Sequence, residues 1–171
     1  MIDNGIVTIN DANVVIDILK LGIASKFFSL DVSFHMTLEV YNEIKDCYSE
    51  LESFVSSGTL SIDTINDYEL FYSVKEEKRQ LSVADCTALV LASELDAILL
   101  TSDNNLRKTA QKHNISIRGH LWIFRQLVEA NLLSPSDAIT LLDQLENTVN
   151  PRLGLPKKDK EDLIAEWKAM P

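Results

Sequence analysis

Two aspartates follow segments that are expected to form strands. Asp11 comes after a short β-branched run at residues 6–9, and Asp103 comes after a continuous apolar run at residues 97–101 with only Ser102 between them. A continuous apolar run is typical of a strand covered on both faces of a parallel sheet. Because ligands of such sheets bind at the carboxyl ends of the strands, we expect both aspartates to lie at that edge.

Three further acids are expected to reach the same edge from helices. Asp85 lies in the first turn of a helix that Ser82 opens, and the two residues approximate a capping box. Glu39 and Glu43 lie one turn apart in the helix after the second expected strand. Carboxylates collected in a partly dry cleft either raise their pKa values or recruit a hard cation such as Mg²⁺ or Mn²⁺. Such a cation activates water and neutralises a phosphodiester, which predicts hydrolytic chemistry.

A purely structural interpretation also fits each aspartate taken alone. Asp11 and Asp103 are good helix N-caps, and Asp85 is a good first-turn residue. The capping interpretation does not explain why the three acids gather at one edge of the sheet. Their joint placement therefore favours a metal site.

Strands and helices alternate along the chain. Strands are expected at residues 6–9, 32–36, 60–65, 97–101 and 115–117, and helices at residues 12–21, 37–47, 49–57, 67–80, 83–95, 104–113, 121–131, 136–147 and 159–170. This order predicts an α/β fold, a three-layer α/β/α sandwich with a central parallel sheet of four to five strands and further helices at the C-terminus. We expect one domain at residues 1–148 and a helical extension at residues 149–171 that packs on or beside it.

The composition is that of a globular protein. The 171 residues are 46% hydrophobic and 25% charged, which excludes wholesale disorder and low-complexity structure. Cys47 and Cys86 are too few for a disulfide framework, and both are expected in or near the core. No apolar run reaches the roughly 18 residues of a membrane span, and no signal-peptide pattern opens the sequence. We therefore expect a cytoplasmic protein without membrane contact.

The charge is unevenly distributed. The formal net charge is −10, which on average repels phosphate. Residues 104–125 nevertheless contain no acid, and they carry the basic side chains Arg107, Lys108, Lys112, Arg118 and Arg125. Two interpretations stay open, a solvated helix face or a local patch that contacts RNA phosphates.

The residues that carry the acids also carry a family resemblance. The segments are Asn10-Asp11-Ala12-Asn13, Thr37-Leu38-Glu39-Val40-Tyr41-Asn42-Glu43-Ile44, Leu81-Ser82-Val83-Ala84-Asp85-Cys86-Thr87-Ala88 and Leu99-Leu100-Thr101-Ser102-Asp103. In order and spacing they resemble the four motif blocks of PIN domains, over about residues 5 to 125. The resemblance implies an endoribonuclease that depends on Mg²⁺ or Mn²⁺, like the VapC-type toxins of toxin–antitoxin pairs. It thereby implies an RNA substrate and a cognate antitoxin, and we also expect a homodimer.

Position by position, the resemblance implies a set of site residues. Asp11, Asp85 and Asp103 would be metal ligands, and Glu43 would be the catalytic acid of the helix. Supporting residues would be Asn13, Glu39 and Ser102, and RNA would contact Arg107, Lys108, Lys112 and Arg118. Many relatives carry a further acid shortly after the last aspartate, where this chain has Asn104 and Asn105. That departure puts a second metal in doubt.

Two other hypotheses remain. One is a PIN-fold protein that binds or regulates without catalysis. The other is a receiver-like phosphoacceptor domain, although Asn10-Asp11 does not supply the acidic pair that it needs. Outside the site, Asp17 is expected at a solvated helix position and His35 as a half-buried, hydrogen-bonded histidine.

Overall fold

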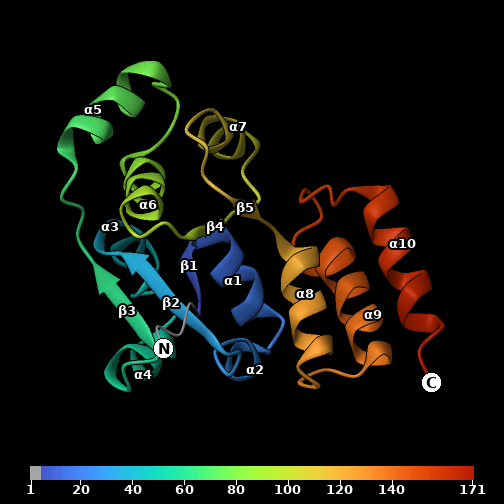
Figure 1. Cartoon of the computed structure of the whole chain (residues 1–171). Coiled ribbons are helices and arrows are strands. Elements are labelled where there is room, and N and C mark those ends of the chain that lie inside the picture. Colours follow the sequence, from blue (N-terminus) through green and yellow to red (C-terminus); the bar gives the residue numbers. More distant parts are fainter. Residues whose placement is uncertain (1–4) are drawn as a thin grey trace.

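The computed structural model describes residues 5–171, in which five parallel strands form one sheet (Figure 1). The strands are β1 (Ile6–Asn10), β2 (Val32–Thr37), β3 (Leu60–Asp63), β4 (Ile98–Leu100) and β5 (Ile117–Arg118). Their order across the sheet is β3-β2-β1-β4-β5, and each neighbouring pair is parallel. The predicted α/β fold with a central parallel sheet flanked by helices is confirmed.

Helices fill the connections between the strands and the C-terminal part of the chain. They are α1 (Ala12–Lys20), α2 (Ala24–Phe27), α3 (Leu38–Ile44), α4 (Leu51–Ser56), α5 (Tyr68–Glu77), α6 (Val83–Glu94), α7 (Asn104–Lys112), α8 (His120–Glu129), α9 (Pro135–Gln144) and α10 (Lys157–Lys168), with a π-helical turn η1 (Leu145–Val149) after α9. Across residues 5–171, none of the helices has both the length and the apolar character needed to cross a bilayer.

The strand order reverses between β1 and β4. β1 pairs with β2 on one side and with β4 on the other, and the backbone amide of Asp11 donates to Leu100 O at 3.1 Å. In open parallel sheets the ligand site lies at the carboxyl ends of the strands where the order reverses. The two strands that lead to Asp11 and Asp103 are therefore the two that flank this point.

The central strands and α6 form the core behind the site. Ile9 of β1 and Leu99 of β4 are fully buried, and α6 packs against β1, β2 and β4. α6 is apolar nearly all round, as expected for a helix enclosed by the protein. Its buried residues, Ala84 and Cys86 to Ala92, fix the position of Asp85 relative to the sheet edge.

Helices α8, α9 and α10 lie side by side at the C-terminal end of the fold (Figure 1). α10 buries Leu163 and Trp167, and Arg125 of α8 donates to both carboxylate oxygens of Glu166 at 3.0 and 3.1 Å. The last helix thus packs on α8 and α9. The division of the chain after residue 148 stays a prediction.

Two expectations were wrong, and one helix was not predicted. The unpredicted helix is α2, whose four residues are too few to show a helical period. The last strand begins at Ile117, since the amide of Ile115 still closes the turn after α7 by donating to Ala110 O at 3.0 Å. Cys86 is buried as expected, whereas Cys47 is exposed just beyond the end of α3.

Asp17 does not occupy a solvated position. Its side chain is buried, and Asp17 Oδ2 accepts hydrogen bonds from His120 Nε2 at 2.9 Å and from Asn150 Nδ2 at 3.0 Å. His120 begins α8 and Asn150 follows η1, so this polar cluster ties α1 to the C-terminal helices. His35 is half-buried and bonded to Asp63 at 2.7 Å, as expected.

Candidate active site

Asp11 is the buried centre of the candidate site. It is the N-cap of α1, where Asp11 Oδ1 accepts from the Ala12 amide at 2.8 Å and Asp11 Oδ2 accepts from the Thr101 hydroxyl at 2.8 Å. Burial raises the pKa of Asp11 to about 6, and the negative charges of Asp85 and Asp103 add to the rise. The hydrogen bonds from Thr101 and Ala12 oppose it. The three aspartates therefore share one electrostatic environment.

Thr101 connects the two strand-end aspartates directly. Its hydroxyl donates to Asp11 and accepts from the backbone amide of Asp103 at 3.1 Å. Thr101 is fully buried at the end of β4. The sequence interpretation did not select Thr101 as a site residue, although a hydroxyl at a strand end before the predicted acid was a usable indication.

Each of the other two aspartates caps a helix with one of its oxygens. Asp85 Oδ2 accepts from the Ser82 amide at 2.9 Å, and the Ser82 hydroxyl accepts from the Asp85 amide at 3.0 Å, so the predicted capping box at α6 is present. Asp103 Oδ1 accepts from the Leu106 amide at 2.7 Å at the start of α7. Both side chains are half-buried, which keeps them within reach of solvent and ligand.

The two glutamates of α3 lie in different environments. Glu43 is exposed, and its pKa is raised by partial burial of the carboxyl and by the charge of Asp85. Glu39 is half-buried, and Glu39 Oε2 is buried without a hydrogen-bond partner among residues 5–171. Glu43 is thus electrostatically linked to the aspartates, while Glu39 offers a free oxygen one helical turn earlier.

The carboxylate oxygens of these acids are the type of ligand that a hard cation prefers, although they are not arranged as a coordination shell. In the described part of the chain, no three His, Cys, Asp or Glu side chains are placed so that they could hold a metal ion together. The aspartates instead use one or both of their oxygens in the hydrogen bonds described above. The donors are all oxygens, the ligands that Mg²⁺ and Mn²⁺ prefer, and the partnerless Glu39 Oε2 lies in the helix that also carries Glu43.

The predicted supporting residues flank the acids. Asn13 is exposed on the first turn of α1, two residues after Asp11. Ser102 is half-buried between Thr101 and Asp103 and lines a pocket described below. No hydrogen bond from the Asn13 or Ser102 side chain to one of the acids is found within residues 5–171.

The predicted RNA-contacting residues fall into two groups. Lys112 is 3.4 Å from Glu77 and its neighbour His113 is 3.0 Å from the same carboxylate, which lowers the pKa of Glu77. Lys108 is exposed. Arg107 and Arg118 instead line a common pocket. The arginines therefore border the site, while Lys112 is engaged elsewhere.

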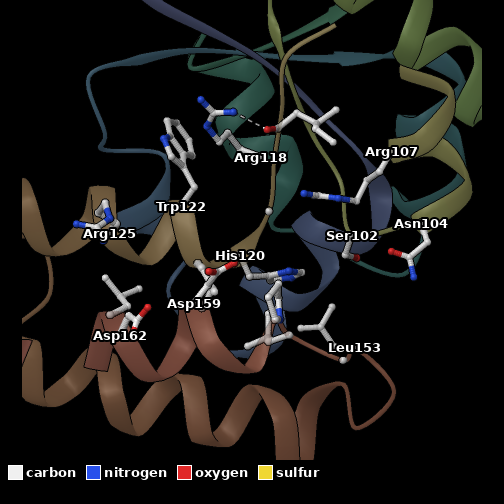
Figure 2. A pocket seen from close by; sticks show the side chains of 17 residues that line it. Ser102, Asn104, Arg107, Arg118, His120, Trp122, Arg125, Leu153, Asp159 and Asp162 are labelled. Carbon is white, nitrogen blue, oxygen red and sulfur yellow. Dashed lines mark hydrogen bonds between the residues drawn. The ribbon is translucent and has the colours of Figure 1, made fainter. Parts of the chain in front are cut away.

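This pocket has a volume of about 620 Å³ and lies between β5, the start of α8 and the chain that leads into α10 (Figure 2). Ser102 and Asn104, the two neighbours of Asp103, form part of its lining. Figure 2 shows Trp122 beside Arg118 and Arg107 extending toward the middle of the pocket. Trp122 was not among the predicted site residues, because nothing in the sequence separates it from a core aromatic of an amphipathic helix.

The acids lie beside the switch point of an open parallel sheet, which is where α/β proteins of this class bind their ligands. A family model of PIN domains matches residues 7–156, which is most of the chain. The chain belongs to the PIN domain family, as its motif blocks predicted.

Among the proteins that are similar to this chain are one characterised by sequence and one by structure. Endoribonuclease Nob1 of Pyrococcus abyssi (strain GE5 / Orsay) is 34% identical over 110 residues, which cover 58% of this chain and 68% of that protein. The crystal structure of PAE2754 from Pyrobaculum aerophilum matches with a TM-score of 0.50 and 12% identity, covering 75% of this chain and 99% of that chain. At that identity the structural match supports the fold alone.

Proposed function

We propose that this chain is an endoribonuclease that depends on Mg²⁺ or Mn²⁺ and hydrolyses phosphodiester bonds of RNA. The observation that carries the proposal is the Thr101 hydroxyl, which links Asp11 to Asp103 at the point where the strand order reverses. The charges of Asp85 and Asp103 also add to the raised pKa of Asp11, which supports a shared acidic site. Membership of the PIN domain family and the similarity to an endoribonuclease support a nuclease.

Asp11, Asp85 and Asp103 are the proposed ligands of the cation, and Glu43 is the acid at the rim. Bound by these carboxylates, a divalent cation would supply a more acidic water and would neutralise the charge that develops on the phosphate. Thr101 orients Asp11 and holds the backbone of Asp103, so it sets the separation of two ligands.

The test is cleavage of structured RNAs in Mn²⁺. Asp11→Asn and Asp85→Asn are expected to reduce cleavage to background, because each removes a charged oxygen ligand, and EDTA is expected to do the same to the unaltered chain. Asp31→Asn, which removes an exposed carboxylate at the amino end of β2, is the matched control and is expected to retain full activity. Cleavage that survives both site substitutions would refute the proposal.

A PIN-fold protein that binds RNA without cutting it is the second candidate. The observation in its favour is that the capping contacts already occupy oxygens of Asp11, Asp85 and Asp103. Metal titration by calorimetry separates the two candidates, since only the nuclease is expected to bind Mn²⁺ in a way that Asp11→Asn abolishes. The receiver-like hypothesis is not supported, because such domains have the strand order 2-1-3-4-5, whereas this sheet has 3-2-1-4-5.

We further propose that the chain acts as the toxin of a toxin–antitoxin pair and forms a homodimer. An acidic site on a chain of net charge −10 suits an antitoxin that inserts a cationic side chain among the carboxylates. A copurifying small protein that inhibits cleavage, and a dimer mass by analytical ultracentrifugation, are the expected results. A monomeric mass would contradict the homodimer. Cleavage that is not inhibited by any small protein coexpressed with this chain would contradict the toxin role.

A further inference from the structure

The 620 Å³ pocket beside the candidate site has walls of opposite character. Arg107 and Arg118 lie on the side that adjoins Asp103, and Asp159 and Asp162 lie on the α10 side (Figure 2). Apolar side chains and Trp122, which lies beside Arg118, complete the lining. A ligand that fits this pocket has an anionic end for the arginine side and an end rich in N–H donors for the aspartate side.

Two guanidinium groups share the basic wall without a carboxylate between them. Within residues 5–171, neither Arg107 nor Arg118 forms an ion pair, whereas Arg125 in the same pocket is neutralised by Glu166. Burial and the nearby charge of Arg118 lower the pKa of Arg107. Arg107 is half-buried, whereas Arg118 is exposed and donates to Ile117 O at 2.8 Å. A phosphate stabilises two neighbouring guanidinium charges, because it accepts several N–H donors at once.

Arg107 is held in place by the backbone around it. Arg107 Nη1 donates to Thr101 O at 2.7 Å. A Cβ atom on Gly119 would lie 3.3 Å from that same nitrogen, so the absence of a side chain at Gly119 makes room for the guanidinium. Thr101 also donates to Asp11, so one residue is hydrogen-bonded to both Arg107 and the centre of the candidate site.

Trp122 supplies an aromatic face next to the arginines. It is half-buried on α8, and Figure 2 shows its ring beside Arg118. Aromatic rings on which bases stack, next to cations that track the backbone, are the usual elements of single-strand binding. Asp159 and Asp162 are exposed on the opposite wall and can accept N–H groups from a base edge.

We propose that this pocket binds one unstacked nucleotide of the RNA, next to the position of cleavage, with its phosphate on Arg107 and Arg118 and its base against Trp122. This inference rests on the proposed function in so far as RNA is the substrate. It assigns a role to α8 and to the segment that leads into α10, which the four acidic motif blocks do not include.

The test is binding of a short single-stranded RNA in EDTA, measured by fluorescence anisotropy so that no cleavage occurs. Trp122→Ala is expected to weaken binding about 5- to 100-fold, and Trp122→Phe is expected to restore most of it, because a phenyl ring still stacks. An abasic oligonucleotide of the same length and charge is expected to bind weakly to the unaltered chain and to be insensitive to Trp122→Ala.

Arg118→Gln and Lys108→Gln form a matched pair of charge variants. Each is expected to reduce the slope of log affinity against log salt by about 0.7, as for one lost phosphate contact on a single strand. Only Arg118→Gln is expected to be non-additive with Trp122→Ala, because both residues contact the same nucleotide. Lys108 is exposed outside the pocket and should combine additively.

Equal affinity of Trp122→Ala and the unaltered chain for the natural RNA would overturn the inference, as would equal affinity for the abasic oligonucleotide. Those results are the ones expected if the pocket receives a protein partner. Cleavage in Mn²⁺ is measured separately. A chain that binds RNA through Trp122 but does not cleave it refutes the nuclease proposal alone, and a chain that cleaves RNA regardless of Trp122 refutes only this inference.

Discussion

Burial and repulsion between neighbouring charges both act on Asp11. Its carboxyl is 4% exposed and lies near two other aspartates, and its pKa is about 6 against an ordinary value of 3.8. Because the pKa of Asp11 is higher in the folded state than in the unfolded state, protonation of Asp11 increases the free energy of unfolding. That contribution is complete below about pH 4 and is lost as the pH rises through 6.

Asp11→Asn is therefore expected to stabilise the metal-free chain at high pH. The difference in the free energy of unfolding should be about 3 kcal/mol at pH 8 and should disappear near pH 4, since a shift of one pKa unit corresponds to about 1.4 kcal/mol. Urea denaturation in EDTA across this range measures it. The exposed Asp159→Asn is the control, expected to stay within about 0.5 kcal/mol at every pH. A difference for Asp11→Asn that does not depend on pH would show that the variant acts through packing instead.

Asp17 is a second residue whose removal has a defined cost. Asp17→Ala leaves His120 Nε2 and Asn150 Nδ2 without their acceptor in a buried cluster, and we expect a loss of about 3 kcal/mol in the free energy of unfolding. Asp17→Asn keeps an acceptor oxygen and should cost less. Chemical denaturation of the two variants checks this order, and an equal loss for both would show that the carboxylate charge is what matters.

At the scale of elements, the N-terminus of α6 is both a cap and part of the site. Ser82→Ala removes the acceptor for the Asp85 amide and should cost about 1 kcal/mol of stability. Because Asp85 is then less firmly held, cleavage should also fall, by about tenfold. Ser134→Ala removes the corresponding cap of α9, at Asp137, and is the matched control. It should cost similar stability and leave cleavage unchanged; an equal loss of cleavage in both would attribute the effect to general destabilisation.

The sequence was sufficient for the elements that place the acids. A strand followed by an aspartate and then a helix is a local pattern, so the neighbourhoods of Asp11 and Asp103 were predicted almost to the residue. Contacts between distant segments were not predictable in this way. Asp17 and His120 are 103 positions apart, and Thr101 and Asp11 are 90 apart. Only the packing of α1 against the later helices and of β1 against β4 brings these pairs together.

At the scale of the whole molecule, the basic residues must act against a net charge of −10. Arg107→Glu combined with Lys108→Glu is expected to weaken RNA binding and to flatten its dependence on salt, because it removes two cations beside the site. Lys157→Glu with Lys158→Glu on α10 is the matched control. Each substitution changes the charge by −2, so either pair takes −10 to −14. Affinities measured at several salt concentrations check this, and equal weakening by the two pairs would mean that only the overall field matters.

The capping contacts have a consequence for relatives of this chain. A carboxylate that caps the N-terminus of a helix stabilises the fold whether or not the protein is a nuclease, so it is retained in both cases. Finding the same aspartates in another member of the lineage is then weak evidence that the member is an active enzyme. A side chain that caps no helix and faces solvent, such as Glu43, is the better indicator of catalysis.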